Sequence, residues 1–211
     1  HTVVARFDAE HPLADVRDPE AELNGADLAI DFSAPDAALD NLHQYCFWGL
    51  DAVVGTTGWY DALDDVRRRV EASVAAVLYA PNFSLGVAVL VRALRAVAPL
   101  LDQLPEYDAW VHEIHHTRKV DSPSGTALQL AGVLVDGLSR KTRVEPETQH
   151  ERIDPAALHV TSTRAGRVVG HHTVGLDSAF DQLRFVHEAK SRQGFAFGAV
   201  RAAEWLPGRR G

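Results

Sequence analysis

Residues 52–80 read AVVGTTGWYDALDDVRRRVEASVAAVLYA, in which two apolar runs of strand length, 52–56 and 75–80, flank a segment with helical spacing. The apolar positions of that segment recur at steps of three, four and four residues, which is typical of an amphipathic helix. They are Leu63, Val66, Val70 and Val74. A strand, a helix and a second strand in this order predict a parallel pair, because the helix carries the chain back along the sheet.

The same alternation extends toward the start of the chain. Residues 2–7 and 28–33 have strand composition, and a short helix between them is indicated by Asp18 as its cap, Pro19 in its first turn and Gly25 beyond its end. The first part of the chain is therefore predicted to be an α/β domain with a parallel sheet.

The pattern changes after Ser84. A buried helix is expected over 85–104, interrupted or kinked at Pro99, and is followed by a strand over 108–115 and a helix that begins near Gly125. Three alternating segments follow without a crossover helix between them, which favours antiparallel pairing. They lie around Val160, at 169–174 and at 183–186. The second domain is therefore predicted to be α+β with a mixed or antiparallel sheet, and a final helix over 195–205 returns to the first domain.

Composition narrows the class of protein. The net charge of −8 and the pI near 5.7 disfavour nucleic acid and anionic membranes as partners. Cys46 is the only cysteine, and no apolar run approaches the ~20 residues of a spanning helix, so we expect a cytoplasmic protein. The chain starts at His1 without a signal-peptide pattern and contains no Met, and we expect a further segment before it.

Residues 111–127, VHEIHHTRKVDSPSGTA, carry the most chemistry. They predict a strand, a polar loop and a helix start, so that imidazole and ammonium groups lie near unpaired backbone amides, which is an arrangement suited to carboxylates. A histidine or lysine there could also transfer a proton near neutral pH. The plain alternative is a surface loop before a helix that Ser124 and Thr126 merely cap.

This run resembles the signature of the dihydrodipicolinate reductases, Glu-x-His-His-x-x-Lys-x-Asp-Ala/Ser-Pro-Ser-Gly-Thr-Ala, with every named position filled from Glu113 to Ala127. The resemblance implies hydride transfer from NADH or NADPH to 4-hydroxy-tetrahydrodipicolinate in the diaminopimelate route to lysine. It implies that His115 and Lys119 are catalytic and that His116, Gly125 and Thr126 bind the carboxylates of the dicarboxylate substrate. It also implies a homotetramer joined through the sheets of the substrate domain.

Further segments resemble the same family: Asp-Phe-Ser-Ala-Pro at 31–35, Gly-Thr-Thr-Gly at 55–58 and Ala-Pro-Asn-Phe-Ser at 80–84. The last two loops imply contacts with the nicotinamide cofactor. The residues concerned are Gly55, Thr56, Thr57, Ala80, Pro81, Asn82 and Phe83. Asp8 matches the position that faces the adenosine ribose, where a carboxylate favours NADH, while Arg6 leaves NADPH open.

The family's Gly-x-x-Gly-x-x-Gly loop does not occur in the sequence, which puts the activity of this exact polypeptide in question. Near the other end, residues 164–172, which read Arg-x-Gly-x-x-x-Gly-x-His, and residues 187–198, which read His-x-Ala-x-Ser-Arg-x-x-Phe-Ala-x-Gly, resemble further segments of the family. We predict a structural or interface role for the histidines of these two segments, which are His171, His172 and His187.

Three alternatives remain open from sequence. His112 to His116 satisfies His-Glu-x-x-His, a zinc-protease pattern that requires a helix, although the context is that of a strand, and we expect no metal site. A related two-domain amino-acid dehydrogenase would share the fold, and an inactive truncated relative would share the ancestry. The favoured organisation is a Rossmann-like, N-terminally truncated nucleotide-binding domain at 1–84, with 192–211 returning to it, and a substrate-binding and oligomerisation domain at 85–191.

Overall fold

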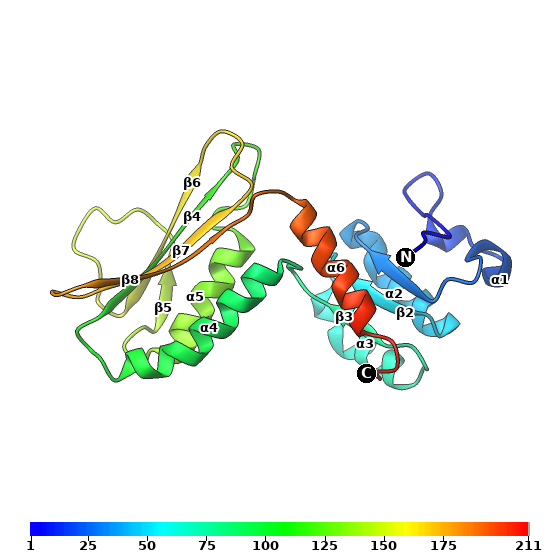
Figure 1. Cartoon of the computed structure of the whole chain (residues 1–211), viewed down its shortest axis with the longest axis horizontal. Helices are drawn as coiled ribbons and strands as arrows, with labels where there is room; N and C mark the ends of the chain where they lie inside the picture. The colour runs from blue at the N-terminus through cyan, green and yellow to red at the C-terminus, as the bar shows by residue number, and fades with distance from the viewer. Residues whose placement is uncertain (211) are drawn as a thin grey trace. The chain divides into compact units, whose positions relative to one another are not determined.

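The computed structural model describes residues 1–210, which form two compact units. Unit 1 contains residues 1–83 and 196–211, and unit 2 contains residues 84–195. Figure 1 shows the order of the elements along the chain. No helix within residues 1–210 combines the length and the apolar character that crossing a membrane requires.

Unit 1 is built on a parallel three-stranded sheet in the order β1-β2-β3. The strands are β1 (Leu28–Asp31), β2 (Asp51–Val54) and β3 (Val77–Tyr79), and the helices are α1 (Pro19–Glu22), α2 (Pro35–Trp48), α3 (Leu63–Glu71), α6 (Gln193–Trp205) and the 3-10 turns η1 (Leu13–Asp15) and η2 (Tyr60–Ala62). Successive side chains of β2 point to opposite faces of the sheet. Ala52 and Val54 pack with α2 and α3, whereas Val53 packs with the end of α6, so helices cover both faces. The predicted α/β class is confirmed.

The expected strand over residues 2–7 is wrong. This segment has no regular secondary structure, and its apolar residues Val3 and Val4 are exposed. A strand persists only when its backbone groups pair with a neighbour, and within residues 1–210 β1 pairs with β2 alone. An apolar run of strand length was therefore not sufficient without an adjacent strand.

The short helix that was predicted from its capping residues is present as α1. The Asp18 carboxylate accepts a hydrogen bond from the amide of Ala21 at 3.3 Å, and Pro19 occupies the first turn. Gly25 follows the helix with a φ of 70°, a left-handed conformation that glycine adopts without strain. Cap, proline and glycine thus mark the ends of this helix.

Unit 2 contains a five-stranded mixed sheet in the order β5-β6-β4-β7-β8. The strands are β4 (Asp108–His115), β5 (Arg143–Glu145), β6 (Ala157–Arg164), β7 (His171–Asp177) and β8 (Gln182–Glu188). Strands β7 and β8 pair antiparallel, as expected, but β6 runs parallel to both β4 and β5. The predicted mixed sheet is confirmed, with α5 as a crossover before β5 and β6 and only short connections between β6, β7 and β8.

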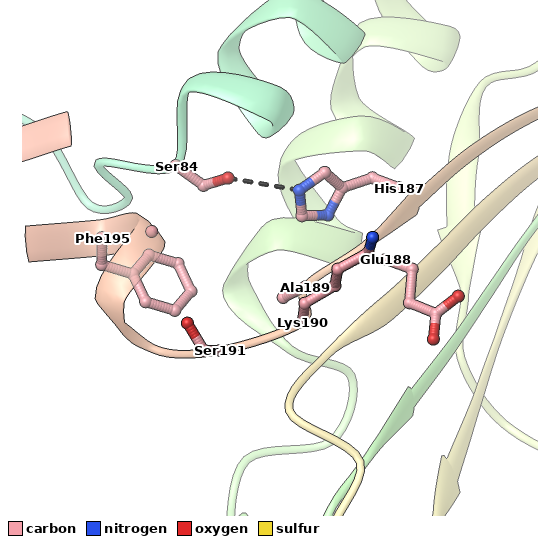
Figure 2. A pocket seen from close by; sticks show the side chains of 8 residues that line it. Ser84, His187, Glu188, Ala189, Lys190, Ser191 and Phe195 are labelled. Atoms are coloured by element: carbon pink, nitrogen blue, oxygen red, sulfur yellow. Dashed lines mark hydrogen bonds between the residues drawn. The ribbon is translucent and has the colours of Figure 1, made fainter. Parts of the chain in front are cut away.

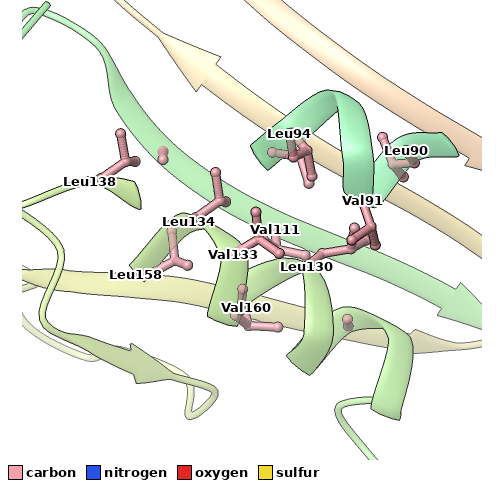
Figure 3. Packing of buried hydrophobic residues seen from close by; sticks show 14 of the residues in the cluster. Leu90, Val91, Leu94, Val111, Leu130, Val133, Leu134, Leu138, Leu158 and Val160 are labelled. Atoms are coloured by element: carbon pink, nitrogen blue, oxygen red, sulfur yellow. The ribbon is translucent and has the colours of Figure 1, made fainter. Parts of the chain in front are cut away.

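Helices α4 (Leu85–Asp102) and α5 (Gly125–Gly137) pack on one face of this sheet. Figure 3 shows leucine and valine side chains of both helices meeting those of β4 and β6. The helix α4 is not interrupted at Pro99, which lies on its exposed side one turn before the end. There, water can hydrate the carbonyl that proline leaves without a donor.

The other face of the sheet in unit 2 carries no helix of its own unit. Side chains of β4 alternate, so that Val111 points to the helices, while Trp110 and Ile114 are half-buried on the opposite side. Trp110 lies over Gly175 of β7, where an added Cβ would come within 2.1 Å of the indole ring. This face therefore has an ordered surface with apolar side chains.

Candidate active site

The segment with the family signature, residues 113–127, forms a strand end, a loop and a helix start in unit 2, which together are called the corner below. Strand β4 ends at His115, a loop follows, and α5 begins at Gly125. Ser124 caps the helix, because its Oγ accepts a hydrogen bond from the amide of Ala127 at 3.2 Å. Apart from its chain neighbours and the backbone of its own helix, no atom comes within 4 Å of the position that a Cβ on Gly125 would occupy. The amide of Ser124, just before the helix, already donates to the carboxylate of Glu113, which shows that this end of α5 attracts anionic groups.

The carboxylate of Glu113 connects the parts of this corner. Its side chain is fully buried, and its Oε2 is hydrogen-bonded to Nδ1 of His115. Arg164 of β6 donates to both oxygens, at 3.0 Å to Oε2 and 2.8 Å to Oε1. The amide of Ser124 also donates to Oε1, at 3.2 Å. The pKa of Glu113 is about 2, because hydrogen bonds, that from Arg164 foremost, outweigh burial, which by itself raises it.

His115 lies in a buried polar environment at the end of β4. Its ring is 5.1 Å from the ring of His172, and an added Cβ on Gly170 would be 3.1 Å from its Nε2. Burial lowers the pKa of His115 below its usual value, and the charges of Lys119 and Arg164 act in the same direction, whereas Glu113 opposes them. These surroundings therefore favour the neutral imidazole more than water does.

The other predicted substrate residues lie on the loop and helix start next to His115. The Lys119 ammonium is 2.8 Å from Oδ1 of Asp121, so this cation has a partner in the protein. Arg192 Nη2 is 3.1 Å from Nε2 of His116. Thr126 is half-buried in the first turn of α5. The five predicted residues thus lie on one segment that runs from the end of β4 through the loop to the start of α5. Their individual roles remain predictions.

A row of histidines continues from His115 across the sheet. His172 Nε2 is 3.3 Å from Oγ of Ser124, and the rings of His172 and His187 are 6.3 Å apart. Figure 2 shows the His187 ring facing Ser84, whose Oγ is 3.2 Å from Nε2, at a pocket of about 230 Å³ between the start of α4 and the end of β8. None of the residues predicted for substrate lines this pocket.

The predicted cofactor loops follow the strands of unit 1. Gly55 and Thr56 come directly after β2, and Ala80 comes after β3, which is the edge where open α/β sheets bind ligands. The Thr56 hydroxyl donates to the carbonyl of Ser33 at 2.8 Å, while Thr57 and Pro81 are exposed. Phe83 is buried and meets the exposed ring of Phe32 edge-on, with their centroids 5.8 Å apart. These loops share one edge of the sheet.

Asp8 lies apart from those loops in the sequence, after the extended segment that was expected to be a strand. Its Oδ1 accepts hydrogen bonds from the amides of Glu10 and His11, at 2.9 and 3.0 Å. These bonds lower the pKa of Asp8, so the carboxylate is ionised at neutral pH. Asp8 is therefore a turn-forming residue, and its part in cofactor binding remains a prediction.

Sequence reasoning assigned no site role to Glu113, Arg164 or His172. The role of Glu113 could have been inferred from the alternation of β4, which places it on the same buried face as Ala109 and Val111. A buried carboxylate needs a charged or hydrogen-bonding partner. The partner, Arg164, is 51 residues away in sequence, and only the β4–β6 pairing brings the two together.

The zinc-protease interpretation of His112 and His116 is wrong on geometry. His112 lies within β4, not on a helix, and its Nδ1 is 2.7 Å from Oγ1 of Thr161. Residues four apart in a strand are separated by about 13 Å, which is too far for two ligands of one ion.

Comparisons with known proteins agree over the whole chain. Residues 4–83 match the family model for the N-terminus of dihydrodipicolinate reductase, and residues 86–211 match the model for its C-terminus. A relative named 4-hydroxy-tetrahydrodipicolinate reductase from Christiangramia forsetii is 37% identical over 211 residues, which cover 100% of this chain and 84% of the relative. A second with this name, from Laribacter hongkongensis, is 38% identical over 92% of this chain and 73% of its own.

Among solved structures, dipicolinate-bound dihydrodipicolinate reductase from Paenisporosarcina sp. TG-14 shares the fold. Its TM-score is 0.71 at 18% identity, and the match covers 88% of this chain and 70% of the other. Two family models that together span nearly all residues, and relatives above one-third identity, confirm the resemblance that the signature at 113–127 indicated. The chain belongs to the dihydrodipicolinate reductase family.

Proposed function

We propose that this chain converts 4-hydroxy-tetrahydrodipicolinate, which yields dihydrodipicolinate by loss of water, to tetrahydrodipicolinate with hydride from NADH or NADPH and a proton, a step in the diaminopimelate route to lysine. Its relatives carry the name of this reductase over most or all of the chain. The observation that carries the proposal is the corner in unit 2, where His115 and Lys119 lie on the strand end and loop that precede the start of α5. A proton donor beside an anion-binding helix end suits the reduction of a dicarboxylate.

In this proposal one unit binds the nucleotide cofactor and the other binds the substrate. Residues 1–84, with 192–211 returning, form the nucleotide-binding domain, and residues 85–191 form the substrate and oligomerisation domain. The parallel sheet of unit 1 supports the first role, since the loops at 55–57 and 80–83 follow the carboxyl ends of β2 and β3. Gly55 and Ala80 are small residues in these loops, and the Phe32 ring lies so close to Gly55 that a Cβ there would come within 2.2 Å of it. The cofactor supplies hydride when bound.

The residues of unit 2 supply charge and protons. The amides at Gly125 and Thr126, with the His116 ring, would bind the two carboxylates, because the amides at a helix start carry partial positive charge that attracts anions. Hydride addition leaves excess electron density on the substrate. Lys119 Nζ or His115 Nε2 would quench that density by giving a proton or a hydrogen bond. Asp121 holds the Lys119 ammonium at 2.8 Å and so limits the volume it samples.

NADH is the favoured cofactor in this proposal. The Asp8 carboxylate is exposed, ionised and already oriented by two turn amides. It would accept hydrogen bonds from ribose hydroxyls and repel a 2′-phosphate. Arg6 lies two residues before it and keeps NADPH within reach, so a ratio of kcat/KM for the two cofactors, measured before and after Asp8→Ala, tests the assignment.

A homotetramer formed through the sheets of unit 2 is part of the proposal. The face opposite α4 and α5 carries Trp110 and Ile114, and the edge strand β8 exposes Leu183 and Val186. An exposed apolar edge of this kind favours association with a second copy. Val186→Lys should lower the mass measured by light scattering, and an unchanged mass would contradict this interface. The single buried Cys46 and the net charge of −8 suit a cytoplasmic protein with no nucleic-acid partner.

The first experiment measures oxidation of NADH and NADPH with dihydrodipicolinate precursor generated in situ, with and without a strong zinc chelator. Aspartate serves as the alternative substrate for an amino-acid dehydrogenase. Oxidation that needs the precursor and resists the chelator is the expected result. If the chain is inactive, the same assay is run on a version extended with a glycine-rich strand and helix, and failure of that version too overturns the proposal.

A further inference from the structure

The Glu113 carboxylate is placed where two halves of the proposed site meet. One oxygen is bonded to His115, at the end of β4, and the other accepts the amide of Ser124, at the start of α5. The side chain is fully buried, so these bonds are shielded from water. One group thus connects the proton-handling ring with the helix end that would bind the substrate's carboxylate.

We propose that Glu113 is a positioning residue that holds His115 in the Nδ1–H tautomer and fixes it relative to α5, while Arg164 balances the charge of Glu113. The proposal rests on the function proposed above and adds two residues to that site. Neither residue needs to touch the substrate, because each acts through His115 or through the start of α5.

The tautomer follows from the bonding partner of the ring. An ionised carboxylate only accepts hydrogen bonds, so the ring atom that faces it, Nδ1, carries the hydrogen. The atom left to gain or lose a proton is then Nε2. It faces Gly170, where a Cβ would lie only 3.1 Å away, so glycine keeps the space beside Nε2 open.

The role of Arg164 follows from its geometry. Its two terminal nitrogens bind the two carboxylate oxygens of Glu113, and Nη2 also donates to the carbonyl of Asp121 at 2.6 Å. A buried carboxylate paired only with His115 would hold that ring in its charged form. With Arg164 present, Glu113 remains paired whether His115 is charged or neutral, so the ring can cycle between the two states.

Four ionisable groups face His115 from the elements packed against it. Glu113 lies on β4, Arg164 on β6, Lys119 on the following loop, and His172 on β7. The two groups of the proposal act in opposite directions: the carboxylate favours the charged ring, and the guanidinium disfavours it. Removing each in turn should therefore shift the titration of His115 in opposite directions.

The test is an NMR titration of His115 in the ligand-free chain, with its ring nitrogens labelled with 15N. Glu113→Gln should lower the pKa of His115 and abolish the preference for Nδ1–H, whereas Arg164→Gln should raise that pKa. Glu106→Gln removes an exposed carboxylate from unit 2 and serves as the matched control, with no expected change. Arg164→Met, which also removes the charge but keeps a long side chain, replaces Arg164→Gln if that variant does not fold, with the same expected rise in the pKa of His115.

Shifts of His115 in the same direction in both variants, or an unchanged tautomer in Glu113→Gln, would overturn the proposal. A kinetic arm completes it: Glu113→Gln should lower kcat by at least about tenfold, with KM for the nicotinamide cofactor little changed. The titration needs no substrate. Opposite shifts in a chain that shows no reductase activity would therefore leave the positioning role standing while the proposed function fails.

Discussion

Acidification should weaken unit 2 through His172. This residue is 4% exposed on β7, near the rings of His115 and His187. Burial, aided by the charge of His115, lowers the pKa of His172 from 6.5 to about 4. The unfolded chain takes up a proton near pH 6.5, whereas the folded chain resists it until about pH 4. The neutral ring therefore contributes stability that is complete above pH 6.5 and is lost as the pH falls toward 4.

The magnitude follows from this shift. Linkage gives a loss of about 2.5 kcal/mol in the free energy of unfolding at about pH 4.5, and about 3.4 kcal/mol when the whole window is crossed. His172→Gln removes the titrating group but keeps an amide that can bond to Ser124. The wild-type chain should therefore lose about 2.5 kcal/mol more than the variant between neutral pH and about pH 4.5.

Urea unfolding at the two pH values, followed by the 19F signal of 5-fluorotryptophan at position 110, measures this difference. Trp110 is the only tryptophan of unit 2, since the others, Trp48, Trp59 and Trp205, belong to unit 1. Equal losses in wild type and His172→Gln would refute the reasoning, because they would mean that the ring titrates in the folded state as it does in the unfolded one.

Three further outcomes are expected. Lys119→Ala should lower kcat about 10²-fold, because it removes a cation near developing negative charge. Arg118→Ala, at an exposed neighbouring position, serves as the control and should leave kcat unchanged. Near-normal turnover of Lys119→Ala would contradict the catalytic assignment. Thr126→Val should weaken binding of a dicarboxylate inhibitor about tenfold with little change for NADH, as measured by calorimetry, and equal losses would indicate a disrupted helix start instead. Gly198→Ala should lower the free energy of unfolding of unit 1, measured in urea, by about 1–3 kcal/mol, because the new Cβ would lie 1.7 Å from the carbonyl oxygen of Phe83. Helix propensity alone predicts the opposite, a more stable variant, and that result would show that α6 can shift to make room.

Local sequence patterns were sufficient to predict those helices and strands whose spacing or capping residues lie within the element itself. The spacing of Leu63, Val66 and Val70 predicted α3, and the alternation over 108–115 predicted β4 with its observed bounds. Ser124 and Gly125 marked the start of α5. These features depend on residues within a few positions of each other, because capping and period are local properties.

Pairing between distant segments was not predictable in the same way. The apolar run at 2–7 predicted a strand, but a strand forms only when it pairs with a neighbouring strand. Likewise, the composition of β6 predicts a strand but not its direction. Its parallel pairing with β4 depends on where α5 returns the chain. Strand direction is a property of the assembled sheet and not of the strand's own composition.

The sequence by itself determined the family, the α/β class of the first unit and the segment that carries His115 and Lys119, because a long contiguous signature holds that information. Only the tertiary structure revealed that Glu113 is buried between His115, Ser124 and Arg164, and that His172 lies against His115. The physical reason is that burial and charge pairing arise when β4 aligns with β6 and β7, and β4 is separated from both of them by dozens of residues. The residues that tune the proposed proton donor are therefore encoded in the sequence but become evident only in the folded sheet.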